Sequence, residues 1–357
     1  MKKFLALLLA LTMALALVAC GGGSDTADTG SGDTSTGDTA TGEFESMTWK
    51  FACSATETSP WVDGAKEFAR IVGEQTGGAI TVQYYPADQL TAGSQTDGIQ
   101  ALMDGTTELS MHSNLIWSSF DQRFNVVSLP FLFDSVEEAD AALDGAGGQA
   151  LGEILESEYN VHLLGIAENG FRHITNSKHA VTSLADMENL KIRVAGSQLL
   201  NRAYELWGAD YTNANWSEVF TALQTGTYDG QENPLPTADA ASIQEVQSYL
   251  TYWTGAYDCL FFCMNADLYN SLSPELQAIV DDAGQQACVY ERELNRGQDQ
   301  EIMDKWAEAG VEITELSADA AAEFAEASAP VYDEFADELT PELIEAFTSV
   351  TQADNAA

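Results

Sequence analysis

After a polar N-terminal stretch, the chain alternates between segments with strand periodicity and segments with helix periodicity. Apolar and polar residues alternate as in strands over residues 47–54, 79–85 and 108–113. Between them, apolar residues recur at helical spacing over residues 59–77 and 98–103. This alternation is typical of α/β domains, in which helices connect the strands of a mostly parallel sheet.

A second series of the same kind occupies the rest of the chain. Its expected strands and helices cover residues 171–176, 190–194, 197–207, 215–226, 256–264 and 273–298. The 357 residues are enough for two domains. No repeat of fixed period indicates a solenoid or a propeller. The sequence therefore predicts an α/β protein with two similar lobes.

The charge of the chain excludes several classes of partner. Asp and Glu number 56 against 14 Lys and Arg, which gives a formal net charge of −42 at pH 7. A surface this acidic repels phosphate backbones and anionic lipid headgroups. We therefore expect neither a nucleic-acid-binding protein nor a polybasic membrane-binding protein.

The N-terminus has the features of an export signal. The basic pair Lys2–Lys3 precedes an apolar stretch, Phe4–Val18, that is short for a membrane span. The segment Leu17–Cys20 (LVAC) resembles a bacterial lipobox, which implies lipidation of Cys20 and cleavage just before it. An ordinary signal peptide with an incidental cysteine is the alternative. Residues 21–42 contain only Gly, Ser, Thr, Asp and Ala and should form a flexible linker at the membrane surface.

Catalytic and metal-binding signatures are not found in the sequence. There is no G-x-S-x-G, H-E-x-x-H, G-x-x-x-x-G-K-[ST] or EF-hand pattern. The histidines show no metal-ligand spacing; they are His112, His162, His173 and His179. We therefore assign no catalytic residue, no metal and no cofactor. The alternative is an exported hydrolase in which a carboxylate acts as the base.

The cysteines beyond Cys20 are Cys53, Cys259, Cys263 and Cys288. Cys259 and Cys263 share one expected strand, where they would lie about 13 Å apart, too far for a disulfide bond. Sequence alone does not rank the other pairings. Buried free thiols are the preferred interpretation.

Two arginines are candidate ligand-binding residues because basic side chains are so scarce. Arg193 lies in the expected strand LKIRV, and Arg172 begins the segment RHITN. Each could be a solvated arginine neutralised by nearby acids. Alternatively, two guanidinium groups from neighbouring strands of one lobe could face a cleft and hold a carboxylate through paired hydrogen bonds.

Several ordered motifs resemble those of one protein family. The stretch NWSEVFTALQTG at residues 215–226, followed by DGQENP at 229–234, resembles the signature of the DctP-type solute receptors of tripartite ATP-independent periplasmic (TRAP) transporters. Further matches in the expected order are YPADQL at 85–90, SLPFLF at 128–133, R-x-x-x-N at 172–176, LKIRV at 190–194 and LSPELQAI at 272–279. The resemblance covers about residues 48–300.

The resemblance implies a two-lobed, periplasmic-binding-protein-like clamshell (type II-like) with a long helix spanning both lobes. Arg193 would pair with the carboxylate of an organic acid, and Arg172 would reach the same group. Asn233 would hydrogen-bond the carboxylate, although an asparagine beside Pro234 also suits a turn. Trp216 would form an aromatic wall where the family often has Phe, although a core role at a helix start is the alternative.

The first lobe would contribute Thr56 and either Ser113 or Asn114. The resemblance implies an organic acid as the ligand, such as a C4-dicarboxylate or a sugar acid, delivered to the membrane subunits of a TRAP transporter. A ligand-sensing lipoprotein on the same scaffold is a second possibility.

The expected division of the chain follows from these elements. Residues 1–19 form the signal peptide, and residues 20–45 the lipidated cysteine and linker. Lobe I comprises residues 46–169 plus about 258–298. Lobe II comprises residues 170–257 plus about 299–345, and residues 346–357 form a tail.

Overall fold

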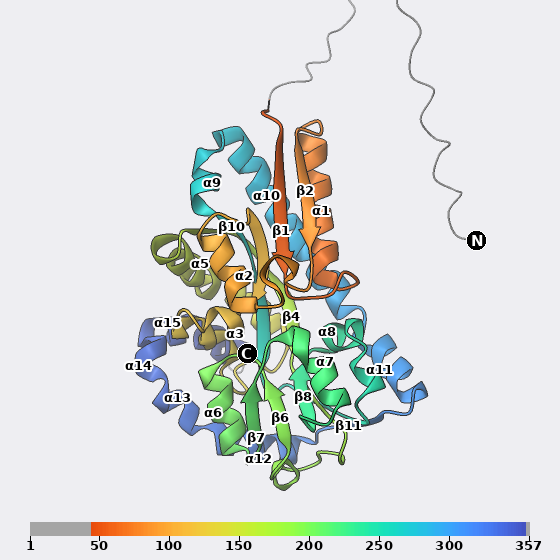
Figure 1. The fold of residues 1–357 in the computed structure, drawn as a ribbon. Coiled ribbons are helices and arrows are strands. Elements are labelled where there is room, and N and C mark those ends of the chain that lie inside the picture. The colour runs from red at the N-terminus through yellow and green to blue at the C-terminus, as the bar shows by residue number, and fades with distance from the viewer. Residues whose placement is uncertain (1–43, 355–357) are drawn as a thin grey trace, which may run out of the picture. The chain divides into compact units, whose positions relative to one another are not determined.

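The computed structural model describes residues 44–354 and contains two β-sheets flanked by helices (Figure 1). The expected signal peptide, Cys20 and the linker lie outside the described residues. Among the residues described, no helix is both long and apolar enough to cross a membrane.

The first sheet has five strands in the order β2-β1-β3-β10-β4. They are β1 (Met47–Cys53), β2 (Ile80–Tyr85), β3 (Leu109–Ser113), β4 (Val161–Phe171) and β10 (Tyr257–Asn265). β1 runs parallel to β2 and β3, whereas β10 runs antiparallel to β3 and β4. β1, β2, β3 and β4 therefore run in the same direction, as expected for a mostly parallel sheet. Only β10, which arrives from the other lobe, runs in the opposite direction.

The second sheet has six strands in the order β11-β9-β5-β8-β6-β7. They are β5 (His173–Asn176), β6 (Lys191–Val194), β7 (Asp210–Asn213), β8 (Gly230–Asn233), β9 (Tyr249–Tyr252) and β11 (Glu312–Glu315). β6 is parallel to β7 and β8, while β5 is antiparallel to β8 and β9.

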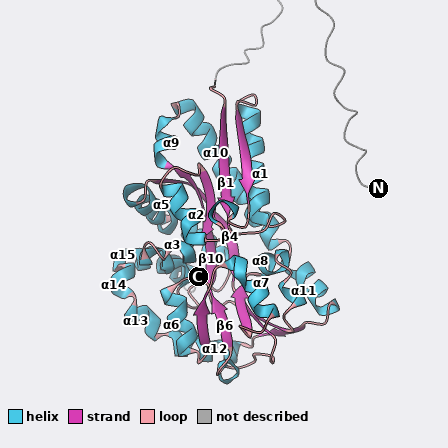
Figure 2. Cartoon of the chain, in the orientation of Figure 1, coloured by secondary structure: helices cyan, strands magenta, loops and turns pink. Residues whose placement is uncertain are grey.

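Helices flank both sheets (Figure 2). In chain order they are α1 (Pro60–Gln75), α2 (Gln95–Met103), α3 (Asn114–Trp117), α4 (Val136–Leu143), α5 (Ala146–Glu158), α6 (Gln198–Leu206), α7 (Trp216–Gln224), α8 (Leu235–Ala240), α9 (Ala266–Ser271), α10 (Pro274–Arg296), α11 (Asp299–Glu308), α12 (Ala318–Ser328), α13 (Pro330–Glu334), α14 (Ala336–Leu339) and α15 (Pro341–Asp354). Short 3₁₀ segments cover Gln89–Thr91, Gln122–Ser128, Leu184–Met187 and Ile243–Glu245.

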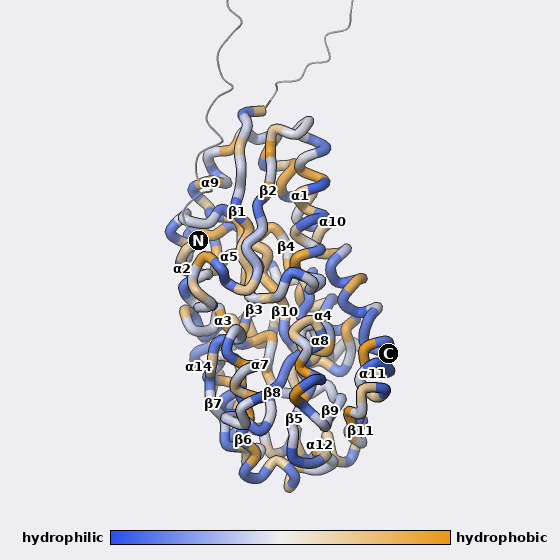
Figure 3. Tube along the Cα trace, turned by 45° about the vertical axis from the view of Figure 1, so that its right-hand side comes forward, coloured by the Kyte–Doolittle hydropathy of each residue, from blue (hydrophilic) through white to orange (hydrophobic). Residues whose placement is uncertain are grey.

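The start of α1 follows directly from local sequence. Ser59 accepts a hydrogen bond from the Trp61 N–H, and Pro60 occupies the first helical position, where its missing N–H costs nothing. The helix buries one apolar face, with Phe68 at its centre, and hydrophobic and hydrophilic residues mix along it (Figure 3). It ends before Gly77, whose φ of +62° favours glycine.

The expected long helix is present as α10, which packs against α1 and β4 of the first sheet. After a break at Gly297 and Gln298, α11 continues the helical path and packs against α8 beside the second sheet. Lys305 of α11 donates to Asp239 of α8 at 2.7 Å. The two-lobed α/β fold is confirmed, with the helical path along the lobes built from two pieces.

The C-terminal segment differs from the expected tail. α15 extends from Pro341 to Asp354 and packs against α4 and α5, which lie in the expected lobe I. Phe347 of this helix is fully buried, and its ring lies beside Gly147, where a Cβ would come within 2.7 Å. The expectation of a tail from residue 346 missed this helix.

The thiols of the described cysteines are buried and unpaired, as the preferred interpretation of the sequence had it; they belong to Cys53, Cys259, Cys263 and Cys288. Burial raises the pKa of each of them.

Candidate functional site

A cavity between the two lobes is lined by residues from both of them. Its walls are formed by Ser54, Ala55, Trp61, Gln95, Ser113, Ile116, Asn169, Arg172, Arg193, Ala195, Trp216, Asn233, Thr237 and Asp258. The cavity therefore contains five of the seven residues expected to bind ligand. Thr56 and Asn114 do not line it.

Arg193 carries a buried charge without an anionic partner. It lies on β6 and is only 2% exposed. Its Nε and Nη2 donate to the Ala214 carbonyl oxygen at 3.0 and 2.6 Å, and no carboxylate of the described residues forms an ion pair with it. Burial lowers its pKa to about 10. The guanidinium is thus held at the cavity by one carbonyl and by the ring of Trp216, whose centroid lies 5.7 Å from Cζ.

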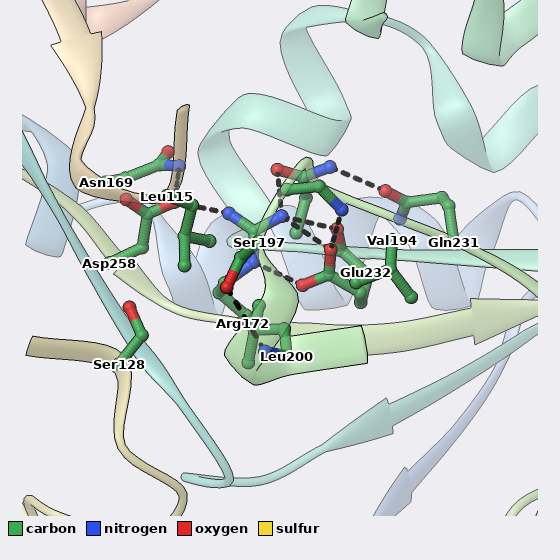
Figure 4. Close-up of polar contacts among 12 residues, drawn as sticks. Leu115, Ser128, Asn169, Arg172, Val194, Ser197, Leu200, Gln231, Glu232 and Asp258 are labelled. Carbon is green, nitrogen blue, oxygen red and sulfur yellow. Dashed lines mark hydrogen bonds and ion pairs between the residues drawn. The ribbon is translucent and has the colours of Figure 1, made fainter. Parts of the chain in front are cut away.

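Arg172 lines the same cavity but is already neutralised. It lies in the gap between β4 and β5, and Figure 4 shows its guanidinium between the carboxylates of Glu232 and Asp258. Its Nη2 also donates to the Asn233 amide oxygen at 3.0 Å and to the Glu232 carbonyl at 2.8 Å. Burial disfavours its charge, but the two carboxylates outweigh burial and raise the pKa of Arg172.

The expected placement of the two arginines on neighbouring strands was wrong. β8, which carries Glu232 and Asn233, lies between β5 and β6. The intervening strand supplies the carboxylate that pairs with Arg172, and this pairing leaves Arg193 as the unneutralised cation of the cavity.

Asn233 ends strand β8, so it lies in a ladder and not in a turn. Its amide donates to Gln231 Oε1 at 2.7 Å and accepts from Arg172. Trp216 is the first residue of α7 and serves both roles considered for it: it lines the cavity and packs against the hydrophobic cluster around Val219.

The candidates from the first lobe are placed differently from one another. Ser113 lines the cavity and donates to Asp258 Oδ1 at 2.7 Å. Asn114 is fully buried, donates to the Phe124 carbonyl and accepts from the Cys259 N–H, so it holds the local backbone. The hydroxyl of Thr56 donates to the Ala240 carbonyl of the other lobe at 3.2 Å.

Contacts between the lobes close over the cavity rim. The Trp216 N–H donates to Gln95 Oε1 at 3.2 Å, and Ser217 Oγ donates to the Gly93 carbonyl at 3.1 Å. Gln95 is the first residue of α2, beside the first sheet, and Gly93 lies just before this helix. Trp216 and Ser217 begin α7, beside the second sheet. The arrangement is therefore a closed clamshell around a charged pocket.

Within the part of the chain that the structure describes, no group of His, Cys, Asp and Glu side chains is arranged to hold a metal ion. The cavity presents the ion pair of Arg172 with Asp258, the Arg193 guanidinium without an ion pair among the described residues, several amides and hydroxyls, and an aromatic wall.

Comparison with protein families identifies the family of the chain. Residues 51–339 match the model of the DctP family, described as bacterial extracellular solute-binding protein, family 7. The chain belongs to this family. The expected resemblance to TRAP solute receptors is thereby confirmed, and the members of the family are extracytoplasmic transport proteins.

Individual relatives of this family 7 protein bind organic acids, according to their names. It is 32% identical over 264 residues to the 2,3-diketo-L-gulonate-binding periplasmic protein YiaO of Escherichia coli, covering 74% of this chain and 80% of YiaO. The sugar-acid-binding protein DctPAm of Advenella mimigardefordensis, crystallised with galactonate, has a TM-score of 0.83 and 28% identity, covering 87% of this chain and 99% of that one. A TRAP solute-binding protein of Ralstonia eutropha with bound (S)-2-acetolactate has a TM-score of 0.82 and 30% identity, covering 85% and 99%.

Several cavity residues of the family 7 protein were not identified from sequence. They are Ser54, Trp61, Gln95, Asn169, Thr237 and Asp258, together with Glu232 beside them. Asp258 was detectable, because a carboxylate inside the apolar strand AYDCLFFCM needs a buried cation as its partner. The others lie within strands, at element ends or on helices, where no spacing rule marks them as cavity residues.

Proposed function

We propose that this protein captures an organic acid outside the cytoplasm by placing the acid's carboxylate against Arg193, and delivers it to the membrane subunits of a TRAP transporter. The observation that carries the proposal is the Arg193 guanidinium, which is buried at the cavity with no carboxylate partner among the described residues. A desolvated cation is stabilised when an anion with two oxygens meets its planar N–H groups.

Arg172 has a different role in this proposal. Because Glu232 and Asp258 already neutralise it, Arg172 orients the side chain of Asn233 and joins the two lobes at the base of the cavity. Asn233 then presents its amide beside the ligand. This assignment makes Arg193 the primary anchor and Arg172 a positioning residue.

Closure links binding to transport. The rim contacts of Gln95 with Trp216 and of Gly93 with Ser217 form only when the lobes meet. A ligand that binds the closed form more tightly than the open form shifts the population toward it. The membrane subunits can then distinguish the loaded protein by its closed surface.

The remaining features of the chain complete the proposal. Lobe I comprises residues 46–169 plus about 258–298, to which we add α15, and lobe II residues 170–257 plus about 299–340. Cys20 carries the lipid that anchors the protein on the extracytoplasmic face of the cell membrane, and Cys20→Ala should release the protein into the soluble fraction. The protein releases its ligand unchanged, so incubation with a bound acid should yield no new product.

The test of the proposed function is thermal unfolding of the purified protein against a panel of sugar acids, hydroxy acids and dicarboxylates. A ligand at 100 times its Kd adds about 2.7 kcal/mol to the stability, which is a readily measured shift. Arg193→Ala should abolish the shift, whereas Lys191→Ala, an exposed residue on the same strand, should preserve it. Shifts of equal size in all three proteins would refute the role of Arg193.

A further inference from the structure

The wall of the cavity formed by the first lobe contains two polar atoms without partners. Ser54 Oγ and Trp61 Nε1 are both buried, and no hydrogen bond to either is found among the described residues. The other buried polar atoms without a hydrogen-bond partner among the described residues, such as Ser110 Oγ and Trp117 Nε1, belong to residues that do not line the cavity. The unpaired groups of Ser54 and Trp61 are therefore in a position to meet a ligand.

Both side chains are held by rigid elements. Ser54 directly follows strand β1, and Trp61 is the second residue of α1. The backbone N–H of Trp61 is already satisfied by Ser59 Oγ at 3.1 Å, and Asp63 lies in the same first turn. The helix terminus is thus capped, and the groups that remain available are neutral: an indole N–H, which only donates, and a hydroxyl, which donates and accepts.

Charge is distributed unevenly across the cavity. The free cation, Arg193, belongs to the second sheet. The cavity residues of the first lobe are neutral except for Asp258 on β10. The carboxylate of Asp258 already accepts from Ser113 and Asn169 and pairs with Arg172. A second carboxylate on the ligand would lie against this wall with no free cation and with Asp258 nearby.

We propose that Ser54 and Trp61 form a subsite for the uncharged, oxygen-bearing part of a ligand whose carboxylate lies on Arg193. The proposal rests on the proposed function and specifies its substrate class: hydroxy or oxo monocarboxylates, in preference to dicarboxylates and to plain alkanoates. A ligand hydroxyl or oxo oxygen accepts from the indole N–H and pairs with the serine hydroxyl, whereas an alkyl chain leaves both buried groups unpaired.

The experiment is isothermal titration calorimetry with two series of acids matched in length. The four-carbon series is D-erythronate, butyrate and succinate, and the six-carbon series is D-galactonate, hexanoate and adipate. The parent should bind a hydroxy acid at least 10-fold more tightly than the alkanoate and the dicarboxylate of the same length. Ser54→Ala and Trp61→Phe should each weaken hydroxy-acid binding by about 5- to 10-fold, the range expected for one neutral hydrogen bond.

Matched controls separate the subsite from general effects on folding. Ser110→Ala and Trp117→Phe remove the same chemical groups from buried positions of the same lobe outside the cavity, and should leave the Kd unchanged. The proposal is overturned if a dicarboxylate binds as tightly as the hydroxy acid, or if the Ser54 and Trp61 variants bind like the controls. If neither hydroxy acid binds the parent, the proposal is also overturned. Binding that survives Arg193→Ala contradicts instead the proposed function on which the subsite rests.

Discussion

Replacing Arg193 by methionine should change stability and binding in opposite directions. In the folded protein, burial lowers the pKa of Arg193 from 12.5 to about 10, a difference that corresponds to about 3 kcal/mol against the charged form. Arginine is charged in both states at pH 7, so this cost is present at all pH values below about 10 and is relieved between about 10 and 12.5. Methionine has a similar length and carries no charge.

The net gain is smaller than the desolvation cost. The variant loses the two N–H groups that donate to the Ala214 carbonyl, which costs about 1 to 2 kcal/mol, and the contact with the Trp216 ring. We therefore expect Arg193→Met to raise the free energy of unfolding of the ligand-free protein by about 1 kcal/mol. Loss of the charged partner should weaken binding of an organic acid by about 2 to 5 kcal/mol, or roughly 30-fold or more.

Urea unfolding followed by tryptophan fluorescence measures the first effect, and calorimetry measures the second. Lys191→Met is the matched control, because it removes the same charge from an exposed position two residues earlier on β6 and should change stability by less than about 0.5 kcal/mol. A variant that unfolds at lower urea with an unchanged m-value would refute the reasoning, since the charge of Arg193 would then stabilise the empty fold.

Three further predictions address closure, pH and charge. Gly93 has a φ of +88°, and a Cβ there would lie 2.5 Å from Ser217 Oγ of the other lobe, so Gly93→Ala should weaken ligand binding about 10-fold in calorimetry. Gly77→Ala is the control: Gly77 has a φ of +62° and nothing within 4 Å of its Cβ position, so this variant should lower stability without weakening binding. Burial raises the pKa of Asp299 to about 6, so its ionised form destabilises the fold as pH rises from about 4 to about 6. In urea titrations, the stability advantage of Asp299→Asn over the parent should therefore grow across that window, and an advantage independent of pH would contradict the prediction. The net charge of −42 repels an anionic ligand, so its association rate in stopped-flow measurements should rise with moderate salt; a steep fall would mean that local attraction by the arginines dominates.

The fold was predictable to the extent that it depends on local patterns. Strand and helix periodicity located several elements of both lobes, including β6 around Arg193 and the long helix α10, but not the short strands β7, β8, β9 and β11. The direction of β10 could not be predicted from sequence. This strand is buried on both faces, and such a strand shows the same residue pattern whether it runs parallel or antiparallel to its neighbours. α15 was missed because its packing partners, α4 and α5, lie about 190 residues earlier in the chain.

The candidate site was predicted in part for a similar reason. Arginines are conspicuous in so acidic a chain, and the family motif pointed to Asn233, although strand β8 was not among the expected elements. Ser54 and Trp61 have no such signal, because a serine after a strand and a tryptophan in a helix's first turn are ordinary residues. They stand out because Ser54 Oγ and Trp61 Nε1 have no hydrogen-bond partner among the described residues, and only the structure shows this.

The difference between the two arginines follows from charge balance across the cavity. Arg172 is paired with two carboxylates, Glu232 and Asp258, so these three groups together carry a net negative charge. Because Glu232 and Asp258 lie on strands of different sheets, the pairing also joins the two lobes. Arg193 brings the sum of these four charges to zero, but it forms an ion pair with none of the described carboxylates and donates only to the Ala214 carbonyl. An organic acid therefore gains little from Arg172, whose charge is already compensated, and gains most from Arg193. Sequence reasoning expected both arginines to reach the ligand carboxylate, because their positions alone do not show which acids they meet. In the fold those acids pair with Arg172, which supports the proposal that Arg193 holds the ligand.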